Sequence, residues 1–351
     1  MSELNSQLGL TGTGVKIGFY EGAEFTVGSS LDLPATRFTV LPGSSGSKDQ
    51  HANHCARILA GTYGVASNAS VYTHNPDHIT YSNESSIEKL LDAGVSLISM
   101  SWTTGRPDPA TYTDFAVWFD HVISYHHVAV FALAGNDLAW DPGCYPYVPN
   151  PASADNVIAV GAINTNYTLN TNDDTGSDFC YEESSGYYVE KPDIMAPGGD
   201  TSSATPFAAG IAALMHQLRP SLKVFPEATK AILMASCHYK TPINGNTELM
   251  TAGITERQGA GVISAYLTVA ITGQGNYGAG ITNANVVKDI RFRQQYYGAS
   301  GLNVSLTWLK GATAVCNSTF QTNPVGQQRQ NLKLTLKYGI STTPLVSKVT
   351  V

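Results

Sequence analysis

Charged residues are scarce in this chain: Asp, Glu, Lys and Arg together make up 13% of its 351 residues. The net charge is −7, and no stretch is rich in Lys or Arg, so the basic surface that nucleic-acid binding requires is missing. The longest apolar stretch, around residues 128–134, is far too short to span a membrane. We therefore expect neither a nucleic-acid partner nor a membrane partner.

Cysteine is also scarce, and no signal peptide is visible. The five cysteines are an odd number with no Cys-x-x-Cys spacing, so at least one thiol is unpaired and no cysteine metal site is indicated. Residues 1–6 lack the basic start and apolar run of a signal peptide. Five Asn-x-Ser/Thr sites would suit a secreted protein, but they also arise by chance in a chain rich in Asn and Thr. The compartment stays open, and these sites alone favour secretion over the cytoplasm.

The chain does contain a regular alternation of apolar strand patterns and helix patterns. Strands are predicted at 15–20, 65–72, 95–101, 128–134, 157–162 and 193–197. Helices are predicted at 51–60, 85–93, 112–126, from about 202 to 219, at 227–236, and from about 258 onward. This alternation indicates an α/β fold with a mainly parallel central sheet and helices on both faces.

The pattern changes near residue 280. Beyond it, apolar and polar residues alternate as in antiparallel strands, at 286–292, 302–309, 331–338 and 345–351. We therefore predict two domains. Residues 1–280 form the α/β domain, and residues 281–351 form a small antiparallel unit of the β-sandwich type, which we interpret as a stabilising cap.

One stretch, Gly199–Pro206, suggests chemistry. It leads from a loop of glycine and hydroxyl residues into a helix rich in small residues, with Pro206 expected in the first turn. The unbonded N–H groups of that turn favour nearby negative charge, which would suit Ser202 as a nucleophile. Alternatively, Thr201 or Ser202 is an ordinary N-cap. The stretch alone does not decide between these interpretations.

Three other segments bear on the choice. Glu21 ends the first predicted strand, His51 opens a helix, and Asn136 follows Ala134-Gly135. With Ser202, these pieces resemble in order the motifs of the subtilisin-like serine proteases, the subtilase family. The family motifs are Asp-Thr/Ser-Gly, His-Gly-Thr-His, Ala-Gly-Asn and Gly-Thr-Ser-Met-Ala-Ser-Pro. Here they stand as Glu21-Gly22-Ala23, His51-Ala52-Asn53-His54, Ala134-Gly135-Asn136 and Asp200-Thr201-Ser202-Ser203-Ala204-Thr205-Pro206.

The resemblance implies a subtilisin-like fold and a serine endopeptidase. Ser202 would attack the scissile carbonyl, His51 would act as general base and acid, and Glu21 would orient His51. The side chain of Asn136 and the backbone N–H of Ser202 would form the oxyanion hole.

The resemblance also implies where a peptide substrate would lie. It would pair as an added strand with Ser99, Met100, Ser101, Trp102 and Thr103, and would contact Leu133, Ala134 and Gly135. Thr103 stands where the family typically has Gly. A side chain there would crowd the primary pocket, so we expect a preference for small or slender residues before the cleaved bond.

Two departures from the family pattern keep alternatives open. Glu21 replaces Asp and is one methylene longer, so Glu24 is a second candidate for the acid. The approach to Ser202 through Pro197–Asp200 is much shorter than in relatives. The alternative function is therefore a catalytically impaired pseudoprotease that acts as a peptide-binding or regulatory module.

We expect no cofactor. His51 and His54 have helical spacing, but no Glu lies between them and no third metal ligand is evident. Calcium is common in the family, and Asp173-Asp174 is only a weak candidate for a structural site. The family usually carries an inhibitory propeptide, which this chain would lack because it begins close to its first core strand.

Overall fold

The protein is described here from a computed structural model. The structure describes residues 8–75, 84–103, 113–136, 148–166, 168, 170–176, 191–243, 246–247, 255, 257–275, 277, 307 and 309, together with the backbone of 334–337 and 344–348. Within these residues no helix is both long enough and apolar enough to cross a membrane.

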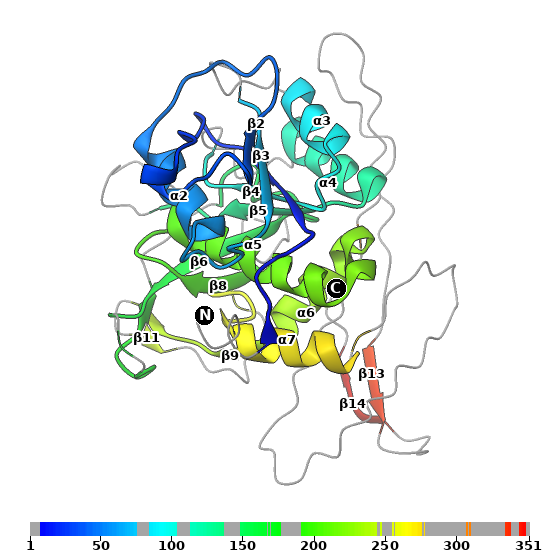
Figure 1. Ribbon diagram of the computed structural model, residues 1–351. Coiled ribbons are helices and arrows are strands. Elements are labelled where there is room, and N and C mark those ends of the chain that lie inside the picture. The colour runs from blue at the N-terminus through cyan, green and yellow to red at the C-terminus, as the bar shows by residue number, and fades with distance from the viewer. Residues whose placement is uncertain are drawn as a thin grey trace.

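A ten-stranded sheet lies at the centre of the molecule (Figure 1). Across the sheet the order is β2 (Phe38–Val40), β3 (Ser70–Thr73), β1 (Lys16–Phe19), β4 (Leu97–Met100), β5 (Ala129–Leu133), β6 (Ile158–Asn164), β8 (Ile194–Pro197), β12 (Val262–Ile263) and β9 (Cys237–Tyr239). The pairings from β2 to β12 are parallel. Strand β9 and the short β7 (Thr175–Gly176), which pairs with β6, are antiparallel. The predicted mainly parallel sheet is confirmed.

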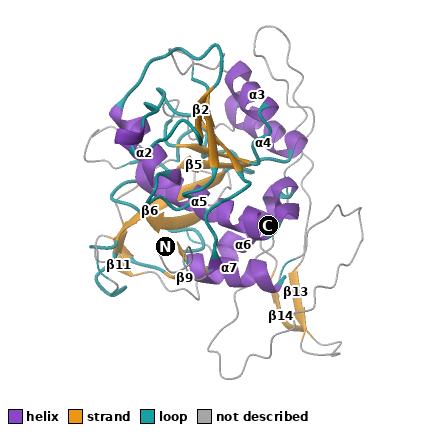
Figure 2. Cartoon of the chain, viewed as in Figure 1, coloured by secondary structure: helices purple, strands orange, loops and turns teal. Residues whose placement is uncertain are grey.

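Helices cover both faces of this sheet (Figure 2). One apolar cluster contains residues of α2 (Gln50–Ala60), α5 (Thr201–Leu218), α6 (Pro226–Ala235) and α7 (Ala265–Gln274). The other contains residues of α3 (Glu84–Asp92) and α4 (Asp114–His126). Two short 3-10 helices, η1 (Ser29–Leu31) and η2 (Pro220–Val224), lie in connections.

The central strands are apolar throughout because both of their faces are covered. All five residues of β5 are buried. Phe131 belongs to the α5 cluster, whereas its neighbours Val130 and Ala132 belong to the α3–α4 cluster. This alternation follows from the pleat of a strand, in which successive side chains point to opposite faces.

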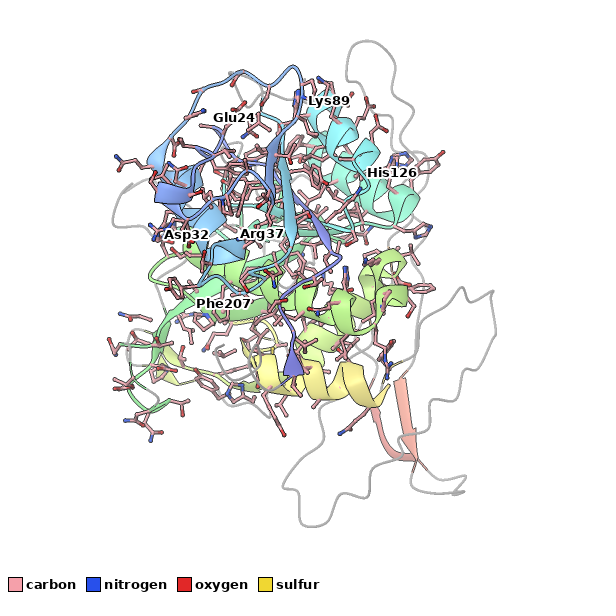
Figure 3. The ribbon with its side chains drawn as sticks, viewed as in Figure 1. Glu24, Asp32, Arg37, Lys89, His126 and Phe207 are labelled. Carbon is pink, nitrogen blue, oxygen red and sulfur yellow. The ribbon has the colours of Figure 1, made fainter. Side chains whose placement is uncertain are left out.

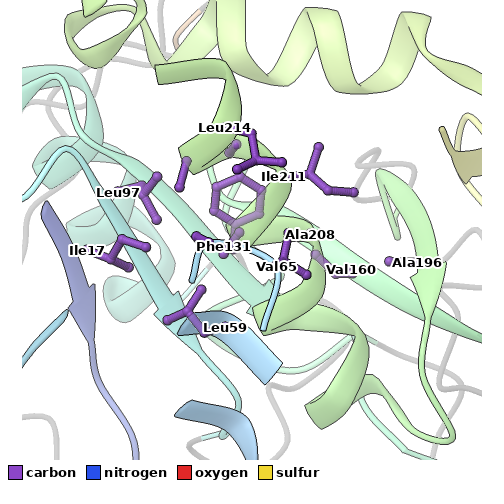
Figure 4. Packing of buried hydrophobic residues seen from close by; sticks show 14 of the residues in the cluster. Ile17, Leu59, Val65, Leu97, Phe131, Val160, Ala196, Ala208, Ile211 and Leu214 are labelled. Carbon is purple, nitrogen blue, oxygen red and sulfur yellow. The ribbon is translucent and has the colours of Figure 1, made fainter. Parts of the chain in front are cut away.

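Helix α5 packs closely on the sheet because small residues line it. Ala208, Ile211 and Leu214 lie near Phe131 of β5 in the same cluster (Figure 4). A Cβ added at Gly210 would lie 2.5 Å from the Cβ of Val65. The helix backbone therefore approaches the segment after α2 too closely for any side chain at residue 210.

The start of α5 differs from the sequence prediction. The helix begins at Thr201, with Asp200 as its N-cap, so Pro206 is the sixth helical residue and does not lie in the first turn. Thr201 and Ser202 are not the N-cap either, because the Asp200 carboxylate accepts the Ser203 N–H at 2.7 Å. Since proline has no N–H, Pro206 cannot donate to the carbonyl of Ser202 four residues earlier.

Other differences concern element boundaries. Strand β3 begins at Ser70, later than predicted, and β2 was not predicted. The helix expected from about residue 258 begins at Ala265, after the short strand β12, because Ser264 caps it by accepting the Leu267 N–H. A small antiparallel pair joins β10 (Pro242–Ile243) and β11 (Asn246–Thr247).

Most of the predicted second unit lies outside the described residues. Apart from residues 307 and 309, its described part is an antiparallel pair, β13 (Leu334–Lys337) with β14 (Pro344–Lys348). The division into domains at residues 1–280 and 281–351 stays a prediction.

Candidate active site

Polar residues follow the carboxyl ends of neighbouring strands at one edge of the sheet. Glu21 follows β1, Asn75 follows β3, Ser101 follows β4 and Asn136 follows β5. The chain first extends the sheet from β1 toward β2 and β3, then crosses to β4 on the other side. Such a reversal of strand order is where open α/β sheets bind ligands.

Glu21 is buried, with 1% of its surface exposed. Its Oε1 accepts the backbone N–H of Ser101 at 2.7 Å, and its Oε2 has no hydrogen-bond partner among the described residues. Burial raises the pKa of Glu21 to about 8, although the hydrogen bonds from Ser101 oppose this shift. An ionised Glu21 is therefore favoured only at alkaline pH in this structure.

The second candidate acid, Glu24, lies in the loop after β1 (Figure 3). Its Oε1 accepts the N–H of Gly46 at 3.0 Å, and its main chain bonds with Ser47 and Asp49 just before α2. Through these hydrogen bonds, Glu24 links the loop after β1 to the loop that leads into α2.

Helix α2 presents two histidines. Asp49 caps the helix by accepting the Ala52 N–H at 2.9 Å. His51 and His54 are exposed, and the Nε2 of His54 lies 3.1 Å from Ser203 Oγ. The Nε2 of His51 lies 3.8 Å from the Sγ of Cys55.

Cys55 is buried directly beneath His51 on the same helix. Burial, and secondarily the charge of Glu21, raise the pKa of its thiol well above the usual range. The thiolate is the reactive form of cysteine, so this residue is unsuited to act as a nucleophile.

Ser202 lies in the first turn of α5 and is 7% exposed. Its carbonyl, which Pro206 leaves without a helical donor, accepts Ser101 Oγ–H at 3.0 Å and Cys55 Sγ–H at 3.4 Å. The end of β4 and helix α2 therefore both contact the backbone of Ser202.

Asn136 lies beside the N-terminus of α5. Gly135 has φ +106°, a conformation that L side chains rarely adopt, and it turns the chain after β5 so that Asn136 follows. The Oδ1 of Asn136 accepts the N–H of Thr201 at 2.9 Å and its hydroxyl at 2.6 Å. Because a backbone N–H can only donate, these bonds fix which end of the amide faces Thr201.

The segments expected to bind substrate are only partly accessible. Ser99 pairs with Phe19 on one side and Phe131 on the other. Met100 pairs with Ala132 of β5, and the side chains of both residues are fully buried. Ser101 and Trp102 are buried as well, so Thr103 is the exposed residue of this segment.

The remaining predicted contacts are buried. Trp102 packs against Tyr20 and Phe115, with ring centroids 5.3 and 6.3 Å apart. Leu133 pairs with Val160 of β6, and Ala134 donates its N–H to the carbonyl of Val160.

The structure thus connects Glu21 with Ser101, Ser101 with Ser202, and Asn136 with Thr201. Within the part of the chain that it describes, no hydrogen bond joins any two of Glu21, His51 and Ser202. Their sequence-based assignment as an acid, base and nucleophile stays a prediction.

Sequence reasoning missed Asn75, whose side chain binds the backbone of Glu21. A signal was present, because a polar residue after a predicted strand lies at the same sheet edge as Glu21.

Among the described residues, no group of three or more His, Cys, Asp or Glu side chains could hold a metal. Asp173 binds the Thr168 hydroxyl and Asp174 binds that of Tyr239. Cys55 is a free thiol, the Sγ of Cys237 donates to the carbonyls of Leu233 and Gly261, and the other three cysteines lie outside the described residues.

Several known proteins are similar to this chain. AprX, a serine protease of Bacillus subtilis, is 33% identical over a match that covers 24% of this chain and 26% of AprX. The chain therefore spans about a quarter of the length of that relative. Subtilisin DY of Bacillus licheniformis is 28% identical, over 61% of this chain and 81% of its own. The solved structure of the prenylagaramide maturation protease PagA has a TM-score of 0.58 at 20% identity, covering 77% of this chain and 98% of PagA.

At 20% identity, the similarity to PagA shows that the two chains share a fold and nothing more. The decisive match is with the sequence model of the subtilase family, Peptidase S8, which covers residues 34–261, well over half of the chain. That range includes His51, Asn136 and Ser202, and Glu21 lies just before it. The chain belongs to the subtilase family.

Proposed function

We propose that the protein is a serine endopeptidase in which Ser202 is the nucleophile, His51 the general base and acid, and Glu21 the residue that orients His51. The observation that carries the proposal is the fixed amide of Asn136 beside the first turn of α5. With Oδ1 bound to Thr201, the donor end, Nδ2, is turned away from Thr201. Nδ2 and the N–H of Ser202 would then serve as oxyanion-hole donors.

The reaction follows from these roles. His51 takes the proton of the Ser202 hydroxyl as that oxygen attacks the scissile carbonyl, and the Asn136 amide stabilises the resulting oxyanion. His51 then returns the proton to the leaving amine, and water hydrolyses the acyl-enzyme by the reverse sequence. Removing one oxyanion donor typically costs about 2.7–4 kcal/mol of transition-state stabilisation.

The missing hydrogen bonds among Glu21, His51 and Ser202 are compatible with this chemistry. Catalytic hydrogen bonds are often long without substrate and shorten in the Michaelis complex. The same observation, with the Oε2 of Glu21 lacking a described partner, also favours the second candidate function, a pseudoprotease that binds peptides without cleaving them.

A fluorophosphonate probe separates the two functions. The wild-type chain should be labelled at Ser202, and Ser202→Ala should abolish labelling. Ser203→Ala is the matched control, because Ser203 is the adjacent residue, is similarly buried, and its hydroxyl lies 3.1 Å from the Nε2 of His54. Well-folded wild-type protein that takes no label would establish the pseudoprotease instead, and label on Ser203 would reassign the nucleophile.

The acid is tested by Glu21→Gln, with Glu24→Gln as its control. Loss of the carboxylate should lower kcat by about 10⁴-fold, the scale seen when a triad acid becomes an amide. Because Glu24 binds the loop at Gly46, its replacement should change kcat little. In the wild type, kcat/KM should also rise with pH through about 8 as Glu21 ionises, and Glu21→Gln should lose that step.

A further inference from the structure

Asn75 holds the turn that carries Glu21. It lies just beyond β3 and is completely buried. Its Oδ1 accepts the N–H of Glu21 at 3.2 Å, and its Nδ2 donates to the carbonyl of Ala23 at 2.6 Å. Since that N–H can only donate and that carbonyl can only accept, the two backbone groups determine the orientation of the amide. One planar side chain thus fixes both ends of the turn from Glu21 to Ala23.

Asn75 is itself held in place by the loop before α2. Its N–H donates to Ser44 Oγ at 2.9 Å, and its carbonyl accepts the Ser44 hydroxyl at 3.2 Å and the Ser45 N–H at 2.8 Å. Its Nδ2 also contacts Thr73 Oγ1 at 3.2 Å. Such a fully bonded side chain can define the position of its neighbours, because moving it would break several buried hydrogen bonds together.

The residues that follow the two strands flanking β1 therefore position different parts of Glu21. Asn75, after β3, fixes its main chain, while Ser101, after β4, binds one oxygen of its carboxylate. A glutamate has one more rotatable bond than the aspartate of the family motif. The position of its carboxylate consequently depends more strongly on where the backbone is held.

We propose that Asn75 is a positioning residue for the reaction: by fixing the turn from Glu21 to Ala23 it sets where the Glu21 carboxylate lies, and through Glu21 it orients His51. The inference rests on the proposed role of Glu21. Asn75 acts from beneath the site and, being fully buried, touches no substrate.

The test variant is Asn75→Leu, which keeps a similar volume and removes both bonds to the turn. We expect kcat to fall about 10–100-fold, since misplacing a catalytic group by about 1 Å costs about 100-fold. KM should change less than about twofold, because ground-state binding is untouched. Thr73→Val is the matched control. It removes only the 3.2 Å contact between Thr73 and Asn75, and should leave kcat within about twofold of the wild type.

A double variant distinguishes positioning from a general structural effect. If Asn75 acts through Glu21, adding Asn75→Leu to Glu21→Gln should lower kcat by less than about threefold, because the interaction is already lost. A further 10–100-fold loss in that background would overturn the inference. If circular dichroism shows that Asn75→Leu does not fold, Asn75→Ser replaces it in both backgrounds with the same expectations.

The outcomes also separate the inference from the proposed function. Wild-type protein that reacts with no fluorophosphonate refutes the proposed function and the inference with it. Labelled, active wild type together with a fully active Asn75→Leu variant refutes the inference alone.

Discussion

A buried charge cluster offers a quantitative test of what holds the sheet together. Lys191 is fully buried, and its ammonium lies 2.7 Å from Oδ2 of Asp193. Lys230 contacts Oδ1 of Asp193 at 2.7 Å, and the N–H of Ala159 donates to Oδ2 at 2.8 Å. Burial opposes ionisation of Asp193, but the ammonium groups outweigh it and hold its pKa below the usual range. One carboxylate thus accepts three donors.

Replacing Asp193 by Asn should destabilise the protein by about 3–5 kcal/mol, the cost of leaving a buried charge without its partner. The Asn side chain has one oxygen for three donors, and its Nδ2 would face one of them. Lys191→Met removes only the ion pair between Lys191 and Asp193, and it leaves Asp193 bound to Lys230 and to Ala159. Its cost should therefore be at most about half that of Asp193→Asn.

Urea unfolding measures both variants, in a Ser202→Ala background so that self-digestion cannot contribute. The urea concentration at the midpoint of unfolding should fall, while the slope of the unfolding free energy against urea concentration stays constant. A constant slope indicates that stability has changed and that the surface exposed on unfolding has not. Equal or greater destabilisation by Lys191→Met would refute the reasoning, because it would show that the charge left behind does not determine the cost. A shift worth less than about 1 kcal/mol for Asp193→Asn would refute it as well.

Two further predictions concern pH and specificity. Burial lowers the pKa of His216 to about 3, and its ring nitrogens lie 3.1 Å from the hydroxyls of Ser96 and Thr229. The unfolded chain binds that proton near pH ~6.5, so stability should fall as pH drops below that value, by about 2 kcal/mol at pH 5. His216→Gln should unfold in urea with a flatter pH dependence, and parallel curves would exclude His216 as the cause. Thr103→Gly should raise kcat/KM about tenfold for peptides with a large residue before the cleaved bond, relative to Ala at that position. An unchanged ratio would show that Thr103 is no wall of the pocket.

The sequence predicted the parallel sheet because its signals are local. The apolar runs that became β4 and β5 are buried on both faces, and that burial is visible in composition alone. Helix boundaries were less accurate. Pro206 was expected in the first turn of its helix because Ser and Thr favour caps and turns, yet Asp200 caps the helix and Pro206 is its sixth residue.

Contacts between distant parts of the chain could not be predicted. The family order indicated Glu21, His51, Asn136 and Ser202, but nothing local showed that the Asn75 amide would bind the Glu21 turn. That contact depends on β3 lying beside β1, which is a property of strand order. The absence of hydrogen bonds among Glu21, His51 and Ser202 likewise depends on side-chain geometry that no motif encodes.

Pro206 shows how such long-range contacts arise from a local rule. A proline at the sixth residue of α5 removes the helical donor for the carbonyl of Ser202, and a buried carbonyl without a donor is costly. Ser101 supplies its hydroxyl at 3.0 Å, while its own N–H binds Glu21 at 2.7 Å. The residue after β4 thus binds both the proposed nucleophile's backbone and the proposed acid. A missing N–H in α5 therefore fixes the relative position of two groups that the proposed reaction must hold together.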